Sequence, residues 1–134
     1  EFRRVLFRSI AFRIELPQEV NCPHDANWLG EAIDNILDNA VKYSQIGGTI
    51  EMIVQKNEMC AKILVKDNGP GIEKGEEHKV FQRFYRGKNV TTQKGYGIGL
   101  YLARKIISLH GGYIIAKSRY PENGLMMEIN LPVC

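Results

Sequence analysis

The sequence lacks the features that mark several classes of protein. No apolar run approaches the roughly 20 residues that span a bilayer, so we expect no direct contact with a membrane. The three cysteines, at positions 22, 60 and 134, form no CxxC pair, which disfavours a zinc site and fits reduced thiols in a cytoplasmic protein. The net charge is only +3 and basic residues are interleaved with acidic ones, so we expect no nucleic-acid partner.

The 134 residues suit one domain with its own core. Apolar residues at strand spacing or helix spacing predict the order strand, helix, two strands, loop, helix, two strands. The expected strands are 10–16, 49–55, 60–66, 113–117 and 125–131, and the expected helices are 25–44 and 97–110. This order predicts an α+β two-layer sandwich, in which helices cover one face of a single mixed sheet.

The first nine residues stand apart from this pattern. They carry four charges, and no structural period continues from them into the following strand. We interpret residues 1–9 as an N-terminal extension, either the remnant of a preceding helix or an appended segment. The domain is therefore expected to cover residues 10–134.

The first predicted helix carries a polar stripe of unusual composition. Glu31, Asn35, Asn39 and Lys42 share one stripe, nearly opposite the apolar side. A solvated polar stripe would be ordinary, but asparagine within a helix costs roughly 0.5 kcal/mol relative to alanine. Two asparagines four residues apart present amide oxygens that can complete the coordination of Mg²⁺ on a phosphate, and Lys42 adds a cation for the phosphates. Taken alone, the stripe is either an ordinary solvated helix face or a metal and phosphate site, and its two asparagines favour the site.

A turn cluster, residues 67–72 (DNGPGI), follows the predicted strand 60–66. Its glycines allow a ligand to approach the backbone closely. A partly enclosed carboxylate at the end of a strand, here Asp67, can accept a hydrogen bond from an exocyclic amine such as that of adenine. The alternative is an ordinary Asp-Asn-Gly turn.

A second glycine-rich segment, residues 94–100 (KGYGIGL), runs directly into the second predicted helix. Alternating glycines at a helix N-terminus leave N–H groups free for an anion, and the helix dipole favours phosphate there. The spacing is neither that of a P-loop nor that of a dinucleotide-binding loop.

An aromatic segment, residues 80–87 (VFQRFYRG), precedes the second glycine loop. Its aromatic side chains either anchor a long loop in the core or begin a lid over residues 80–94. In the lid interpretation Arg86, with Lys88 or Lys94, reaches the phosphates of the nucleotide.

Taken in order, these segments resemble the signature of sensor histidine kinases. The run NxxxNAxKY from Asn35 matches the asparagine box of that family, DNGPGI its first glycine box, FxxFYR from Phe81 its phenylalanine box, and GYGIGL its second glycine box. The LHGG run at 109–112 and the LP pair at 131–132 resemble it too. The resemblance implies the Bergerat ATP-binding fold, with a mostly antiparallel sheet, helices on one face and an ATP lid.

Matched residue by residue, the resemblance implies that Asn39 binds Mg²⁺ and that Asn35 supports the metal and the phosphates. Lys42 would contact phosphate, Tyr43 would pack near adenine, and Asp67 would hold the adenine amino group. Further nucleotide contacts would come from Gly69, Gly71, Ile72, Phe84, Arg86, Lys94, Gly95, Tyr96, Gly97, Ile98, Gly99 and Leu100. The residues implied in catalysis are Asn35, Lys42 and Arg86.

One position separates kinase from hydrolase within this fold. In the related ATPases, and in mitochondrial-type and anti-sigma kinases, a glutamate stands four residues before the metal-binding asparagine. Here that position holds Asn35, whose amide is not a general base. The resemblance therefore implies phosphoryl transfer from ATP to a histidine. A regulatory module that binds nucleotide without catalysis, such as an anti-sigma-type regulator, and a gyrase-like ATPase fragment are the alternatives.

The acceptor histidine is expected elsewhere. None of His24, His78 and His110 lies in the helical His-Glu/Asp-x-x-x-Pro setting of that family's acceptor, and His110 is expected to cap the second helix. The implied partners are the dimerisation domain of the same kinase and, through it, a response regulator. The isolated domain is expected to be monomeric, and to be the cytoplasmic portion of a membrane-anchored bacterial sensor kinase.

Overall fold

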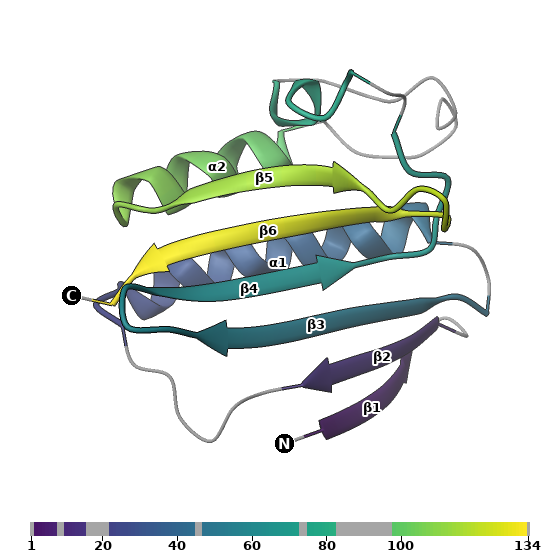
Figure 1. Ribbon diagram of the computed structural model, residues 1–134, viewed down its shortest axis with the longest axis horizontal. Coiled ribbons are helices and arrows are strands. Elements are labelled where there is room, and N and C mark those ends of the chain that lie inside the picture. Colours follow the sequence, from purple (N-terminus) through teal and green to yellow (C-terminus); the bar gives the residue numbers. More distant parts are fainter. Residues whose placement is uncertain are drawn as a thin grey trace.

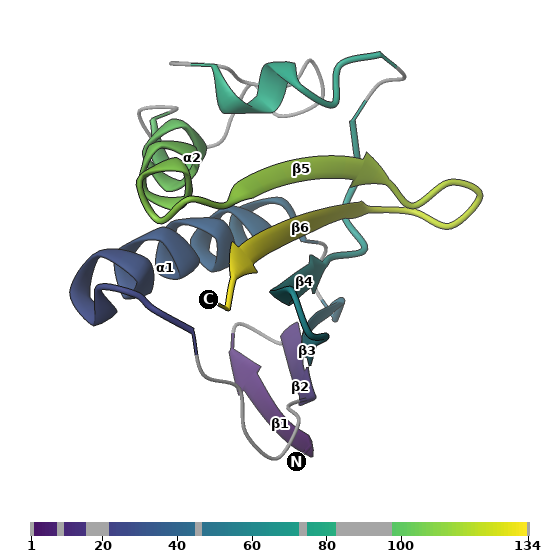
Figure 2. The same cartoon turned by 60° about the vertical axis from the view of Figure 1, so that its left-hand side comes forward.

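The computed structural model describes residues 2–7, 10–15, 22–44, 47–72, 75–82 and 98–133. A six-stranded sheet carries two α-helices on one face (Figures 1 and 2). The elements in chain order are β1 (Phe2–Phe7), β2 (Ile10–Glu15), α1 (Ala26–Tyr43), β3 (Thr49–Lys56), β4 (Cys60–Lys66), the 3-10 helix η1 (Lys79–Phe81), α2 (Gly99–Leu109), β5 (Tyr113–Ser118) and β6 (Leu125–Pro132). The predicted α+β sandwich is confirmed.

The sheet is mixed and mostly antiparallel. The strands lie in the order β1-β2-β3-β4-β6-β5. Strands β2 and β3, which flank α1 in the chain, pair in parallel, and each other neighbouring pair is antiparallel. A parallel pair needs a long crossover, which α1 supplies, whereas antiparallel neighbours need only a turn.

The N-terminal segment differs from the expectation of a helix remnant outside the fold. Phe2–Phe7 form strand β1, which pairs antiparallel with β2 from Phe2↔Glu15 to Phe7↔Ile10. This pairing gives backbone partners to the edge of β2 that faces away from β3. The sequence did not predict this strand because the segment has no clear apolar alternation of its own, and the interpretation of residues 1–9 as an appended segment stays a prediction. The position of the domain boundary stays a prediction.

Helix α1 begins and packs as its sequence predicts. Asp25 is the N-cap, and its Oδ1 accepts a hydrogen bond from the Trp28 N–H at 3.1 Å. The residues of α1 that are buried recur at helical spacing; they are Leu29, Ala32, Ile36 and Ala40. They enter one core with Ile50, Val65 and Ile107, among others, so that α1 lies flat against the sheet.

The two helices are antiparallel neighbours, joined at one end by a histidine. His110 ends α2, and its Nδ1 donates to the Ile106 carbonyl at 2.8 Å. Its Nε2 accepts a hydrogen bond from the Asp25 N–H at 3.0 Å, at the start of α1. The predicted capping role of His110 is confirmed, and the same side chain also connects the two helices.

The sheet face away from the helices carries a buried polar cluster. Glu128 and Asn130 alternate along β6 with the core residues Met127 and Ile129, and so point to the opposite face. The Asn130 amide donates to Glu128 at 3.1 Å, and the Lys117 ammonium lies 3.4 Å from the same carboxylate. Burial of Glu128 opposes its ionisation, but these contacts outweigh burial and lower its pKa.

Among the described residues, no helix is long and apolar enough to cross a membrane.

Candidate nucleotide-binding site

The asparagine box and the second glycine loop meet where α2 begins. A methyl group at Gly99 would lie 3.7 Å from Oδ1 of Asn35 and 3.8 Å from its Cβ, so the first turn of α2 packs directly on the Asn35 side chain. Asn35 and Gly99 are 64 positions apart in the sequence (99 − 35), and the antiparallel helix pair brings them together.

In the described part of the chain, the side chain of Asn35 carries a buried polar atom without a hydrogen-bond partner, its amide nitrogen Nδ2. A buried amide donor without a partner costs about 1–3 kcal/mol, and such atoms concentrate at binding sites. The side chain is therefore poised to donate to a group that the described residues do not supply.

The N-terminus of α2 has the character of an anion site. Among the described residues no side chain caps it, whereas Asp25 caps α1, and its first turn contains no acidic residue. Its N–H groups and the positive end of its dipole are thus available to a phosphate. Gly99 and Leu100 lie in this turn, and Ile98, which precedes it, is 37% exposed.

The first glycine box packs against the end of α1. A methyl group at Gly69 would lie 2.2 Å from the carbonyl oxygen of Tyr43, so only glycine fits there. Asn68 accepts a hydrogen bond from the Thr49 N–H at 3.2 Å and ties the same turn to the start of β3. The turn predicted to surround the adenine base therefore lies directly against the end of the helix that carries Asn35 and Asn39.

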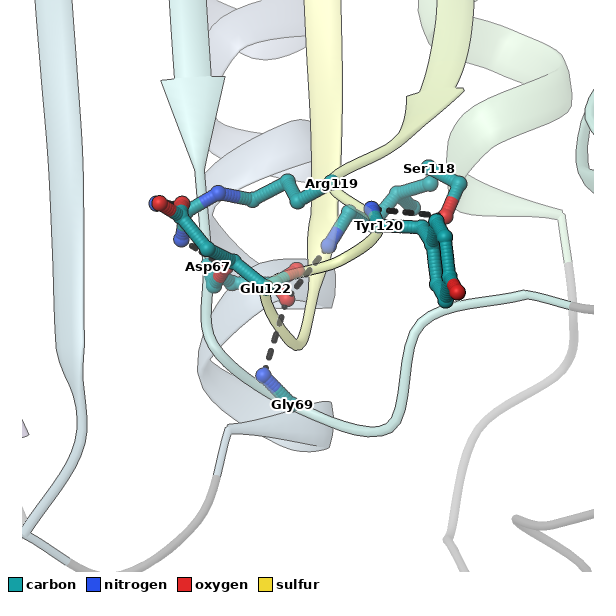
Figure 3. A network of polar contacts seen from close by, with 7 residues as sticks. Asp67, Gly69, Ser118, Arg119, Tyr120 and Glu122 are labelled. Carbon is teal, nitrogen blue, oxygen red and sulfur yellow. Dashed lines mark hydrogen bonds and ion pairs between the residues drawn. The ribbon is translucent and has the colours of Figure 1, made fainter.

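Asp67 is 6% exposed, which excludes an ordinary solvated turn. Its Oδ1 accepts hydrogen bonds from the N–H groups of Gly69 at 3.0 Å and Leu125 at 3.1 Å (Figure 3). Burial raises the pKa of Asp67, although the two N–H groups and the Arg119 guanidinium act in the opposite direction. The result is an enclosed acceptor whose Oδ2 has no hydrogen-bond partner in the described part of the chain.

The turn between β5 and β6 packs against the backbone of Asp67. A methyl group at Gly124 would lie 2.0 Å from the Asp67 carbonyl oxygen, and Gly124 has φ +116°. Arg119, in the same turn, donates from Nη1 to that carbonyl at 2.5 Å. The sequence motifs gave neither Arg119 nor Gly124 a role at the site: Pro121, Asn123 and Gly124 indicate a turn between two strands, and nothing local links that turn to Asp67.

The remaining predicted contacts divide between described and undescribed residues. Lys42 is exposed in the last turn of α1, Asn39, Tyr43, Gly71 and Ile72 are partly buried, and Leu100 is buried. The predicted lid and loop residues Phe84, Arg86, Lys88, Lys94, Gly95, Tyr96 and Gly97 lie outside the described residues.

The aromatic segment begins in the core. Val80 and Phe81 are buried in η1, and the Arg104 guanidinium of α2 lies 5.6 Å from the centre of the Phe81 ring. For Phe81, the interpretation as a core anchor is confirmed. The anchor ties the start of the predicted lid segment to the helix whose N-terminus faces Asn35.

The side chains of the asparagine helix fit a metal ion that is bound partly by the protein and partly by the phosphates of a nucleotide. Among the described residues no three His, Cys, Asp or Glu side chains cluster to hold an ion. The amide oxygens of Asn35 and Asn39 are neutral, hard donors that can fill part of the octahedral shell of Mg²⁺, the rest of which phosphate oxygens and water supply.

Comparison with known proteins agrees with this geometry. The family model for histidine kinase-, DNA gyrase B- and HSP90-like ATPases matches residues 24–133. The adaptive-response sensory kinase SasA of Rippkaea orientalis is 33% identical over 137 residues, which cover 100% of this chain and 35% of that protein. The sensor protein kinase PmrB of Pseudomonas aeruginosa is 34% identical over 105 residues, which cover 78% of this chain and 22% of that protein.

Solved structures show the same fold. The mycobacterial sensor histidine kinase MprB superposes with a TM-score of 0.83 and 30% identity, over 92% of this chain and 84% of that one. The catalytic domain of the histidine kinase ThkA superposes with a TM-score of 0.80 and 27% identity, over 94% and 82%. The chain spans about a third or less of the length of SasA and PmrB. It belongs to the histidine kinase-, DNA gyrase B- and HSP90-like ATPase family, with the fold of a histidine kinase catalytic domain.

Proposed function

We propose that this domain binds Mg-ATP and donates its γ-phosphate to a histidine on a separate dimerisation domain in two-component signalling. The observation that carries the proposal is Asn35, a partly buried side chain against the N-terminus of α2 whose Nδ2 atom is buried. Its Nδ2 donor has no partner among the described residues, and its amide cannot act as a general base. The site can therefore hold phosphate without activating water, which favours transfer over hydrolysis.

The residues divide into a base side and a phosphate side. Asp67 accepts from the adenine amino group, and Gly69, Gly71, Ile72 and Tyr43 surround the base. The first turn of α2 binds phosphate through its N–H groups. Lys42 and Asn35 add a cation and an amide donor on the α1 side.

Mg²⁺, when bound, neutralises charge on the phosphates. Asn39 is its protein ligand in this proposal, with Asn35 in support. The contribution of the chain to transfer is positioning and charge stabilisation, with no covalent step on the protein, as is general for phosphoryl transfer. Arg86 contributes a further cation from the lid segment.

One relative supports a response regulator as a partner. ThkA, 23% identical, has been solved in complex with the response regulator protein TrrA. We propose that this domain acts on a dimerisation domain that bears the acceptor histidine, and through it on a response regulator. We also propose that the domain belongs to the cytoplasmic portion of a membrane-anchored kinase.

Calorimetric titration with an ATP analogue, with and without Mg²⁺, tests the metal assignment. Mg²⁺ should tighten binding to the wild type, and Asn39→Ala should lower the affinity measured with Mg²⁺ by about tenfold or more. The matched control is Asn27→Ala, an exposed asparagine at the other end of the same helix, which should behave as wild type. Equal affinity for the wild type and Asn39→Ala in both conditions would show that Asn39 is not a metal ligand.

Transfer is tested separately with radiolabelled ATP and a dimerisation domain from the same kinase. Label on its histidine supports the kinase proposal. Tight Mg-ATP binding without transfer to the matched domain would instead favour a regulatory module of the same fold.

A further inference from the structure

The turn between β5 and β6 holds the backbone of Asp67 from both sides. The Asp67 N–H donates to the Leu125 carbonyl at 3.0 Å, and the Asp67 carbonyl accepts from Arg119 Nη1 at 2.5 Å. Together with the two N–H groups on Oδ1, these contacts engage every polar group of Asp67 except Oδ2, as far as the described residues show. The turn thus decides which carboxylate oxygen is left for a ligand.

Arg119 is built into this turn. Its N–H donates to the Gly124 carbonyl at 3.1 Å, and its own carbonyl accepts from the Glu122 N–H at 2.9 Å. Its side chain is 20% exposed, and Nη2 lies 3.3 Å from Oε2 of Glu122 (Figure 3). The guanidinium is therefore held between Asp67 and Glu122, with one donor nitrogen for each.

We propose that Arg119 is a positioning residue for adenine recognition, which fixes the Asp67 turn so that Oδ2 is directed to the amino group of the base. This inference rests on the proposed role of Asp67 as the adenine acceptor. Arg119 acts on the base through Asp67 and does not itself contact the nucleotide.

Two further properties of Arg119 suit this role. Its planar fork bonds the Asp67 carbonyl while Glu122 holds the other nitrogen, so rotation of the guanidinium is restricted. Its positive charge also lowers the pKa of Asp67 against the effect of burial, which favours the ionised acceptor. Lysine can supply the charge and a single donor nitrogen, but not the planar pair of nitrogens that contacts Asp67 and Glu122 at once.

The test compares two ligands that differ only at the base: ADP and purine ribonucleoside diphosphate, which lacks the 6-amino group. Calorimetric titration of the 134-residue chain should show wild type preferring ADP by about tenfold or more. Arg119→Met keeps the aliphatic stem and removes the donor. It should reduce the preference to about threefold or less, with the affinity for the purine analogue nearly unchanged.

Two further variants complete the design. Arg119→Lys should give a preference between those of the wild type and Arg119→Met, and it serves as the comparison if the methionine variant does not fold. Arg13→Met is the matched control, because β2 is separated from β6 by β3 and β4, and it should retain the wild-type preference.

The outcomes separate this inference from the proposed function. If wild type binds both ligands equally, Asp67 is not the adenine acceptor. The proposed adenine contact and the positioning role of Arg119 are then both overturned. If wild type prefers ADP but Arg119→Met keeps the full preference, the positioning role alone is overturned. An equal loss of affinity for both ligands in Arg119→Met also overturns it, since a merely structural defect does not depend on the amino group.

Discussion

Replacement of Asp67 by asparagine separates the cost of this residue to folding from its value to binding. Asparagine keeps an Oδ1 acceptor for the N–H groups of Gly69 and Leu125, but it replaces Oδ2 with an NH₂ donor. That donor would face the donor amino group of adenine. Loss of a hydrogen bond to a charged group costs about 1.5–3 kcal/mol, so we expect affinity for ADP to fall by about 10- to 150-fold.

The free energy of unfolding should not fall in Asp67→Asn, in contrast to the affinity for ADP. Burial raises the pKa of Asp67 above its ordinary 3.8, so between this value and the folded-state pKa the folded chain binds more protons than the unfolded chain. The free energy of unfolding therefore falls as pH rises through that interval, and the ionised carboxylate remains a net cost at pH 7.

Urea unfolding and ADP titration at pH 7, measured on the same preparations, check both parts. Asp67→Asn should be at least as stable as the wild type while binding ADP more weakly. A variant that is less stable but binds ADP normally would refute the reasoning, because Asp67 would then be a structural residue and not a ligand acceptor.

Two further predictions concern stability. Gly124→Ala should lower the free energy of unfolding by about 3 kcal/mol or more, because its methyl group would lie 2.0 Å from the Asp67 carbonyl oxygen at a φ of +116°. In the control Gly30→Ala the added methyl group meets open space in α1, so the free energy of unfolding should rise by up to about 1 kcal/mol. Urea unfolding measures both variants, and equal changes in the free energy of unfolding would contradict the packing argument. Because Asn130 and Lys117 lower the pKa of Glu128 below its ordinary 4.5, their stabilisation should be present above pH 4.5 and lost as pH falls through the folded-state pKa. Thermal melts from pH 3 to 6 should therefore show a steeper acid loss in the wild type than in Glu128→Gln, and parallel curves would contradict this.

Much of the fold could be predicted because its signals are local. Asp25 followed by a helical apolar period specifies the start of α1 and its buried side, and the structure confirms both. The glycine pair 111–112 likewise marks the end of α2. These signals depend on residues within a few positions of one another, where backbone geometry and side-chain period act directly.

The parts that could not be predicted depend on register between distant strands. Arg119 lies 52 positions from Asp67, and only the pairing of Lys66 with Met126 and of Ser118 with Leu125 brings its turn beside that residue. Apolar alternation states which face a residue occupies, but not which residue of another strand lies opposite. An arginine in a polar turn therefore gave no sign that its guanidinium would be largely buried.

The candidate site was predictable in its motifs but not in its contacts. The boxes identified Asn35 and Asp67, yet the unpartnered Asn35 amide and the contact between Gly69 and the Tyr43 carbonyl became visible only in the folded chain. Their roles toward nucleotide and Mg²⁺ stay predictions, which the titrations above address.

The histidine that joins the helices also bears on where phosphate can go. Both ring nitrogens of His110 are occupied: Nδ1 carries its proton toward Ile106, and the lone pair of Nε2 points at the Asp25 N–H. A phosphoryl group needs such a lone pair, so modification of His110 would release the start of α1 from the end of α2. His110 also lies at the opposite end of α2 from Gly99, where the phosphates are proposed to bind, so its place in the fold suits a structural link between the helices and not a phosphate acceptor.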